Sequence, residues 1–138
     1  MNIKPSSKCP CFSGSAYRDC CQPVHKALGA GVSAEKMMRS RYSAFALGLV
    51  DYLVATLDPT HADAKLDPAA LRAAMGASAR GHKYTGLRIL SVEDGEEKSV
   101  VTFHARLFEK GQDRSFTERS TFLRRGDKWL YAVGEAEP

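Results

Sequence analysis

From Val101 to Leu107 the sequence reads VTFHARL, in which apolar residues alternate with polar ones. Successive side chains of a β-strand point to opposite faces, so a period of two predicts a strand with one apolar face. The same period recurs in three other segments of the second half of the chain. The residues expected to share a face are Leu87, Ile89 and Ser91; Val101, Phe103, Ala105 and Leu107; Phe116, Glu118, Ser120 and Phe122; and Trp129, Tyr131 and Val133.

Three short connections join these four segments, at residues 93–96, 110–113 and 125–127. Each contains a glycine, which accepts the positive φ that tight hairpins need. The second half of the chain is therefore expected to form an antiparallel meander.

Three helical segments are expected before the sheet. The first begins after Ser33, a suitable N-cap, and carries an apolar stripe at helical spacing, with Ser40 pointing away from it. The stripe consists of Met38, Tyr42, Phe45 and Leu49. A second helical segment covers residues 51–57, and a third covers 69–80 after the N-cap Asp67. Helices followed by a strand meander predict an α+β fold, with helices packed on one face of a curved antiparallel sheet.

The composition fits a soluble domain with a small appendage, because 43% of the 138 residues are hydrophobic and 26% are charged. No apolar run is long enough to span a membrane or to serve as a secretory signal, so we expect a cytoplasmic protein. Residues 1–50 contain seven Lys and Arg against two Asp and Glu, which places the basic excess in the N-terminal third. Such an excess permits weak attraction to RNA or to acidic protein surfaces.

All four cysteines fall within thirteen residues, in the pattern C-x-C, eight residues, C-C. Four thiolates suit the tetrahedral preference of Zn²⁺, and residues 13–15 provide the turn between the two pairs. The proposed zinc ligands are Cys9, Cys11, Cys20 and Cys21. Two disulfides would need an oxidising compartment, and four free thiols are the third alternative. His25 could replace one thiolate, although we expect it to be an exposed surface residue.

A zinc ion held by four protein ligands has no open position for water or substrate, so its role should be structural. The cations around the cluster are Lys4, Lys8, Arg18 and Lys26. They could offset the negative charge of a tetrathiolate centre, or they could present a basic surface to a partner. The sequence leaves both explanations open.

The cysteine spacing, with Gly14 and Tyr17 between the pairs, resembles the SEC-C zinc-binding motif. This motif is named after the C-terminus of the SecA translocation ATPase, where it is a metal-folded docking element for protein partners. The segments at residues 38–45, 118–122 and 129–131 resemble the YchJ family of bacterial proteins. No defined biochemical activity comes with that family name.

The resemblance implies a cone-shaped domain similar to nuclear transport factor two and cystatin, in which helices and a curved sheet enclose a pocket. Residues 1–8 are expected to form a flexible lead, and Gly29 and Gly31 indicate a linker. The chain therefore divides into a zinc knuckle with its flexible lead, residues 1–27, and an α+β domain, residues 33–134, which the resemblance implies to be cone-shaped. We call these two parts the knuckle and the main domain.

Polar residues of the main domain are candidates for a pocket or a buried ion pair: Arg39, Arg41, Tyr42, Tyr52 and Glu118. The two arginines lie at the edges of the helical stripe, and Glu118 shares a strand face with apolar residues. One hypothesis is a pocket floor that holds an anionic or polar small molecule. The other, which we favour, is an ion pair between Glu118 and Arg39 or Arg41 that fixes helix against sheet.

Two functions therefore compete. The first is a zinc-binding interaction or adaptor protein whose knuckle docks on a protein or ribonucleoprotein. The second is a small-molecule binder or an enzyme that uses the cone pocket. No catalytic residue is assigned, because His61, His82 and His104 have no partner at catalytic spacing. The sequence lacks an aromatic cluster in a basic groove, so sequence-specific nucleic-acid binding is not expected.

Overall fold

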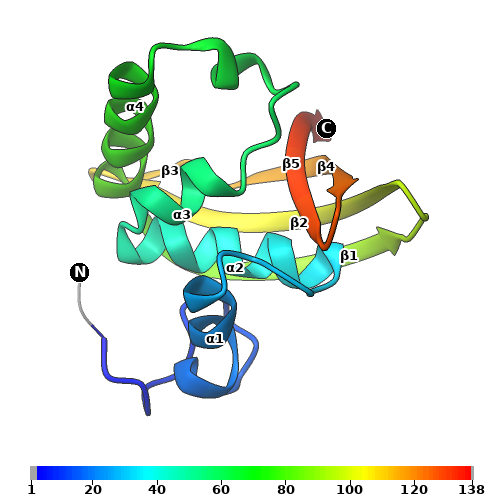
Figure 1. The fold of residues 1–138 in the computed structure, drawn as a ribbon. Helices are drawn as coiled ribbons and strands as arrows, with labels where there is room; N and C mark the ends of the chain where they lie inside the picture. Colours follow the sequence, from blue (N-terminus) through cyan, green and yellow to red (C-terminus); the bar gives the residue numbers. More distant parts are fainter. Residues whose placement is uncertain (1–2, 138) are drawn as a thin grey trace.

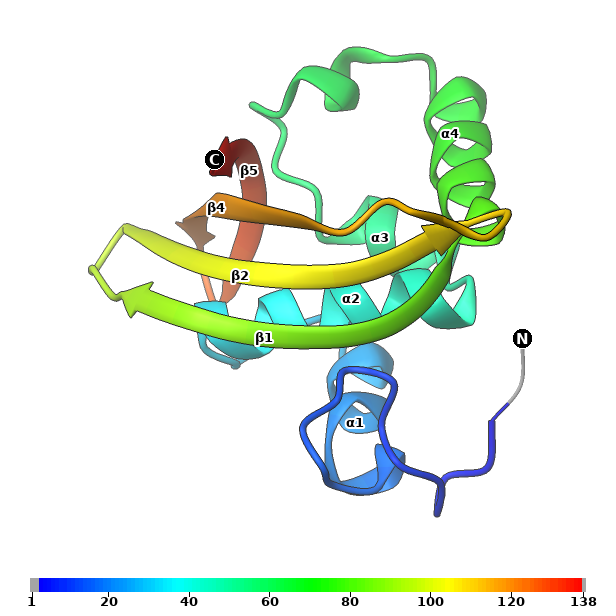
Figure 2. The same cartoon turned by 180° about the vertical axis from the view of Figure 1, so that it is seen from behind.

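The computed structural model describes residues 3–137, which form a layer of helices on one face of a curved antiparallel sheet (Figures 1 and 2). The predicted α+β class is confirmed. In chain order the elements are η1 (Tyr17–Asp19), α1 (Cys21–Lys26), α2 (Ala34–Leu47), α3 (Val50–Ala55), η2 (Ala62–Lys65), α4 (Pro68–Gly81), β1 (Lys83–Glu93), β2 (Lys98–Glu109), β3 (Gln112–Asp113), β4 (Phe116–Arg125) and β5 (Lys128–Glu137).

The sheet is the predicted antiparallel meander, with strand order β1-β2-β4-β5 and the short β3 paired with β2. In its centre Val101 lies opposite Ser120 and Phe103 lies opposite Glu118. The inner, helix-covered face therefore carries the residues that the alternation placed together in β2 and β4.

Two predicted inner positions are wrong, because irregularities in the strand register shift the alternation. In β1 the register shifts between Ile89 and Ser91, and Ser91 is exposed. In β5 the partners of Thr121 and Phe122 are Val133 and Tyr131, which leaves one residue of β5 unpaired. Val133 consequently lies on the outer face, where it is 46% exposed.

The predicted helix starts are confirmed by their caps. Ser33 Oγ accepts a hydrogen bond from Lys36 N at the start of α2, and Asp67 Oδ2 accepts from Ala69 N and Ala70 N at the start of α4. Helix α2 ends at Gly48, whose φ of 71° is a left-handed conformation that favours glycine.

The knuckle packs directly against α2, and its cysteines belong to the same cluster of buried residues as the core of the sheet (Figure 1). The flexible lead expected at residues 1–8 is wrong from Pro5 onward: Tyr17 N donates to Ser7 O, and Arg18 N donates to Pro5 O. Residues 1–2 of that expectation lie outside the described part of the chain. Gly31, expected in a linker, donates its N–H to Asp127 O and is thereby tied to the β4–β5 hairpin.

Candidate metal centre and pocket

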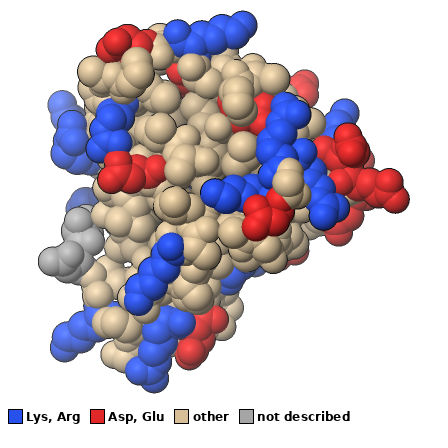
Figure 3. All heavy atoms as spheres, viewed as in Figure 1, with Lys and Arg blue, Asp and Glu red and all other residues tan. Residues whose placement is uncertain are grey.

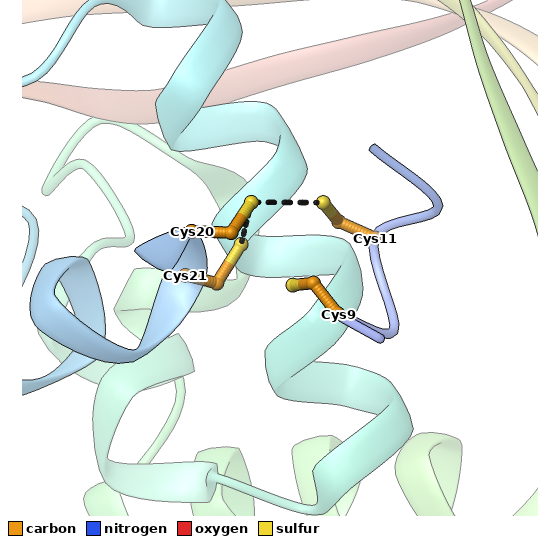
Figure 4. Close-up of side chains that lie close together, drawn as sticks. All are labelled: Cys9, Cys11, Cys20 and Cys21. Carbon is orange, nitrogen blue, oxygen red and sulfur yellow. Dashed lines mark hydrogen bonds between the residues drawn. The ribbon is translucent and has the colours of Figure 1, made fainter. Parts of the chain in front are cut away.

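The four cysteine side chains converge from two peptide segments, with their sulfur atoms pointing toward one another (Figure 4). All four are buried free thiols, and their Sγ atoms lie within 4.8 Å of one another. The Sγ atoms of Cys11 and Cys20 are 3.6 Å apart, and those of Cys20 and Cys21 are 4.0 Å apart. A tetrahedral ion with metal–sulfur bonds of about 2.3 Å has sulfur–sulfur edges of about 3.8 Å. The cluster therefore fits a four-coordinate metal.

Local turns bring the two pairs together. Cys9 N donates to Ser15 O across the loop, and Phe12 N donates to Cys9 O in a tight turn in which Phe12 adopts a φ of 62°. On the opposite side η1 leads directly into α1, so that the second pair lies at the start of this helix.

The cysteine thiols shift one another's pKa values. Hydrogen bonding from Cys21, together with that from Cys9, holds the pKa of Cys11 far below its usual range. The same hydrogen bonds raise the pKa of Cys9 to about 11 and raise that of Cys21 further. Metal binding requires thiolates, so a bound metal would have to displace the protons that Cys9 and Cys21 hold.

Helix α2 supplies polar contacts to the cluster that the sequence analysis missed. Lys36 Nζ donates to Cys20 Sγ at 2.9 Å. Burial lowers the pKa of Lys36, but the hydrogen bond to Cys20 and the nearby cysteine charges outweigh burial and raise this pKa. The ammonium therefore stays charged beside the sulfur. Arg39, expected to reach the core, instead donates to Cys11 O at 3.2 Å and pairs with Glu35. The prediction for Arg39 is wrong because the knuckle covers this side of the helix.

His25, in α1 of the knuckle, faces helix α2 of the main domain and is only 9% exposed, so its expected surface position is wrong. Its Nε2 is 2.8 Å from Ser40 O, and its Nδ1 is 2.6 Å from the Tyr17 hydroxyl. A carbonyl only accepts, so Nε2 carries the hydrogen and Nδ1 accepts from tyrosine. Burial lowers the pKa of His25, which favours this neutral form. Ser40, expected to point away from the core, is fully buried at this contact.

A separate cavity of about 340 Å³ lies between the inner face of the sheet and the helices α2 and α4. Three of the candidate residues line it: Arg41, Tyr42 and Glu118. Tyr52 does not. It is buried and its hydroxyl is 2.6 Å from Ser40 Oγ, which places it in the contact between α2 and α3.

The favoured ion pair is not formed: among the described residues, no carboxylate lies within salt-bridge distance of Arg41. The guanidinium of Arg41 donates through Nη1 to Leu53 O and Thr56 Oγ1, at 2.9 and 2.7 Å. Glu118 Oε2 accepts from the hydroxyls of Ser120 and Tyr131, at 2.6 and 2.9 Å. The two charges therefore have different partners at the floor of the same cavity.

Together these features define a class of protein: a cone-shaped α+β domain like that of nuclear transport factor two, with a cysteine cluster at its N-terminal end. A sequence model described as "YchJ, middle NTF2-like domain" matches residues 33–134. The chain therefore belongs to the YchJ family, as its sequence motifs implied.

Relatives and solved structures agree with this assignment. A UPF0225 protein of Pectobacterium carotovorum is 37% identical over 134 residues, covering 94% of this chain and 83% of the relative. A UPF0225 protein of Streptomyces coelicolor is 37% identical, covering 95% and 97%. The solution structure of a SEC-C motif containing protein from Rhodopseudomonas palustris is similar with a TM-score of 0.82 and 34% identity, covering 94% and 98%. A crystal structure of such a protein from Psychrobacter arcticus gives 0.78 and 26%, covering 99% and 86%.

Among the described residues, no helix combines the length and the apolar character that crossing a membrane requires.

Proposed function

We propose that the four cysteines hold one structural Zn²⁺ ion and that the knuckle, shaped by this ion, is a docking element for a protein or ribonucleoprotein partner. The observation that carries the proposal is the convergence of four buried sulfur atoms within 4.8 Å. All-sulfur tetrahedral sites favour zinc or iron–sulfur chemistry, and four protein ligands around one zinc ion leave no position for a substrate. A reducing compartment keeps such thiols available, which supports a cytoplasmic location.

The charge distribution supports docking over simple charge compensation. Within the described residues, Lys36 of α2 is the cation that hydrogen bonds to a cysteine sulfur. The cations of the knuckle itself are exposed, and Lys and Arg side chains gather at this end of the molecule (Figure 3). The exposed residues are Lys4, Lys8, Arg18 and Lys26. Lys8 donates to Gly14 O and Arg18 pairs with Asp19, both at the exposed surface, so an acidic partner surface or phosphate groups can still reach these cations.

The metal is tested first. Native mass spectrometry of reduced protein, purified with and without added zinc, should show one bound ion per chain. Cys20→Ser should lose the ion. A mass without metal in the wild-type protein, or an iron–sulfur cluster in its place, would contradict the assignment.

Docking is then tested by charge reversal at the knuckle. A variant carrying Lys8→Glu, Arg18→Glu and Lys26→Glu should lose partners that the wild type retains from a bacterial lysate. The matched control reverses three exposed lysines of the main domain: Lys65, Lys83 and Lys110. Equal loss in both variants would indicate nonspecific charge attraction and would remove the knuckle as the docking element.

The cavity of the main domain supports a second candidate function, the binding of a small molecule. Its volume of about 340 Å³ lies at the lower end of the range for small-molecule sites, roughly 300–1,000 Å³. A thermal-shift screen of metabolites would test it. Failure of every charged and neutral compound to stabilise the protein would count against this function.

A further inference from the structure

The floor of the cavity presents a buried cation whose hydrogen bonding is incomplete. Arg41 is 4% exposed, and its Nη1 makes both of its hydrogen bonds, to Leu53 O and Thr56 Oγ1. Among the described residues, no protein atom accepts a hydrogen bond from Nε or Nη2. Every fully enclosed polar side-chain atom in this part of the chain does have a hydrogen-bond partner, so Nε and Nη2 are not fully enclosed. These donors are therefore open to the cavity that Arg41 lines. The guanidinium also stacks on the ring of Tyr131, with 4.9 Å between Cζ and the ring centroid, which fixes its orientation.

The same floor presents an anion that is equally incomplete. Both hydrogen bonds to Glu118 go to Oε2, from the hydroxyls of Ser120 and Tyr131, and Oε1 accepts none. Gly134 makes this arrangement possible, because a Cβ atom there would collide with the Tyr131 hydroxyl and would lie 2.4 Å from Glu118 Cδ. Tyr131 thus connects the two charges: its ring lies beside Arg41 and its hydroxyl binds Glu118.

The walls of the cavity are mostly apolar, although His61, Asp63, Ser78 and Tyr84 also line it. They carry the aromatic rings of Phe45, Phe103 and Phe116 and the aliphatic side chains of Leu107 and Met75. A ligand that fits here must therefore combine an apolar body with a small polar head.

We propose that the cavity binds a small apolar molecule bearing a carboxylate next to a hydrogen-bond donor, as apolar 2-amino acids and 2-hydroxy acids do. The carboxylate accepts from the free donors of Arg41, and the neighbouring ammonium or hydroxyl donates to Glu118 Oε1. A zwitterionic head matches a floor that holds one positive and one negative charge without pairing them. This inference rests on the second candidate function, small-molecule binding in the cavity.

The test compares probes that share one apolar body but differ in the head group. Calorimetry and ¹H–¹⁵N correlation NMR are carried out on the full chain with L-phenylalanine, 3-phenyllactate, 3-phenylpropionate, phenethylamine and the neutral benzyl alcohol. L-phenylalanine and 3-phenyllactate should bind at least about tenfold more tightly than the other three probes. Each of those three lacks part or all of the head group and so loses at least one charge-assisted hydrogen bond. The shifted resonances should include the backbone amides of Arg41 and Glu118.

A variant separates the head group from the fold. Glu118→Gln retains the shape of the side chain and should weaken L-phenylalanine about tenfold while leaving 3-phenylpropionate unchanged. The matched control is Glu93→Gln, at an exposed carboxylate of β1 outside the cavity, which should change neither.

The outcomes distinguish the two levels of the proposal. If benzyl alcohol or 3-phenylpropionate binds as well as L-phenylalanine, the cavity is a binding site but the proposed head group is wrong. If no probe shifts a cavity resonance at millimolar concentration, both the ligand class and the small-molecule function fail.

Discussion

Replacing His25 by phenylalanine tests the contact that joins the knuckle to the main domain. The variant keeps a ring of similar size but removes both nitrogens. The Tyr17 hydroxyl then lacks its buried acceptor, which costs about 1–3 kcal/mol. Ser40 O loses one donor but keeps the hydroxyl of Ser43 at 3.0 Å, so this loss costs about 1 kcal/mol. We expect a decrease in the free energy of unfolding of about 2–4 kcal/mol in total.

The assay is urea unfolding of zinc-saturated protein at pH 7.5, where His25 is neutral in both folded and unfolded chains. Tyr17→Phe and the double variant complete a double-mutant cycle. Each single change leaves the other partner unsatisfied, so the double variant should be destabilised by about 1–2 kcal/mol less than the sum of the singles. A loss below about 1 kcal/mol for His25→Phe, or strictly additive losses, would refute the stabilising role of the Tyr17–His25 hydrogen bond.

Three further changes have defined outcomes. Hydrogen bonding by Arg125 lowers the pKa of Asp58 to about 2. The ionised Asp58 therefore contributes its full stabilisation above the usual pKa of aspartate, and this contribution is lost as pH falls toward 2. The stability difference between wild type and Asp58→Asn, measured by urea unfolding, should shrink over that pH interval, and a constant difference would contradict the ion pair. Gly134→Ala overpacks the cavity floor and should cost about 1–3 kcal/mol in the same assay, whereas unchanged stability would show that the floor can relax. Lys36→Met removes the hydrogen-bond donor to Cys20 Sγ and should weaken zinc binding about 10–100-fold. Competition with a chromophoric chelator measures this affinity, and an unchanged affinity would contradict the prediction.

Much of the fold could be predicted from the sequence because its signals are local. Alternation in β2 and β4, the cap at Ser33 and the cap at Asp67 each depend on a few neighbouring residues, and all appear as expected. The register irregularities in β1 and β5 could not be foreseen, because an unpaired residue in a strand leaves no compositional mark when its neighbours are ordinary strand residues.

The cysteine cluster was predicted because its spacing is itself the signal, whereas the polar contacts around it were not. These contacts form only because the chain folds back: Lys36 of α2 is 16 residues from Cys20, and His25 of the knuckle is 15 residues from Ser40. The sequence pattern predicted a surface position for His25 and carried no signal for Lys36. The predicted ion pair between Arg41 and Glu118 was wrong for a related reason. Their opposite charges correctly placed both residues in one cavity, but the sequence did not show that each hydrogen bonds to a nearer neutral group.

Helix α2 explains both failures, because two sides of it are buried. A helical wheel finds one apolar stripe and assigns the opposite side to solvent. Here the knuckle covers that opposite side, and hydrogen bonds add to the apolar contacts there, so the polar residues Ser40 and Ser43 are fully buried. The adjacent residue, Arg41, points into the cavity of the main domain. A single helix therefore positions side chains at both the cysteine cluster and the cavity, and a domain boundary drawn at its start separates two parts that share one core.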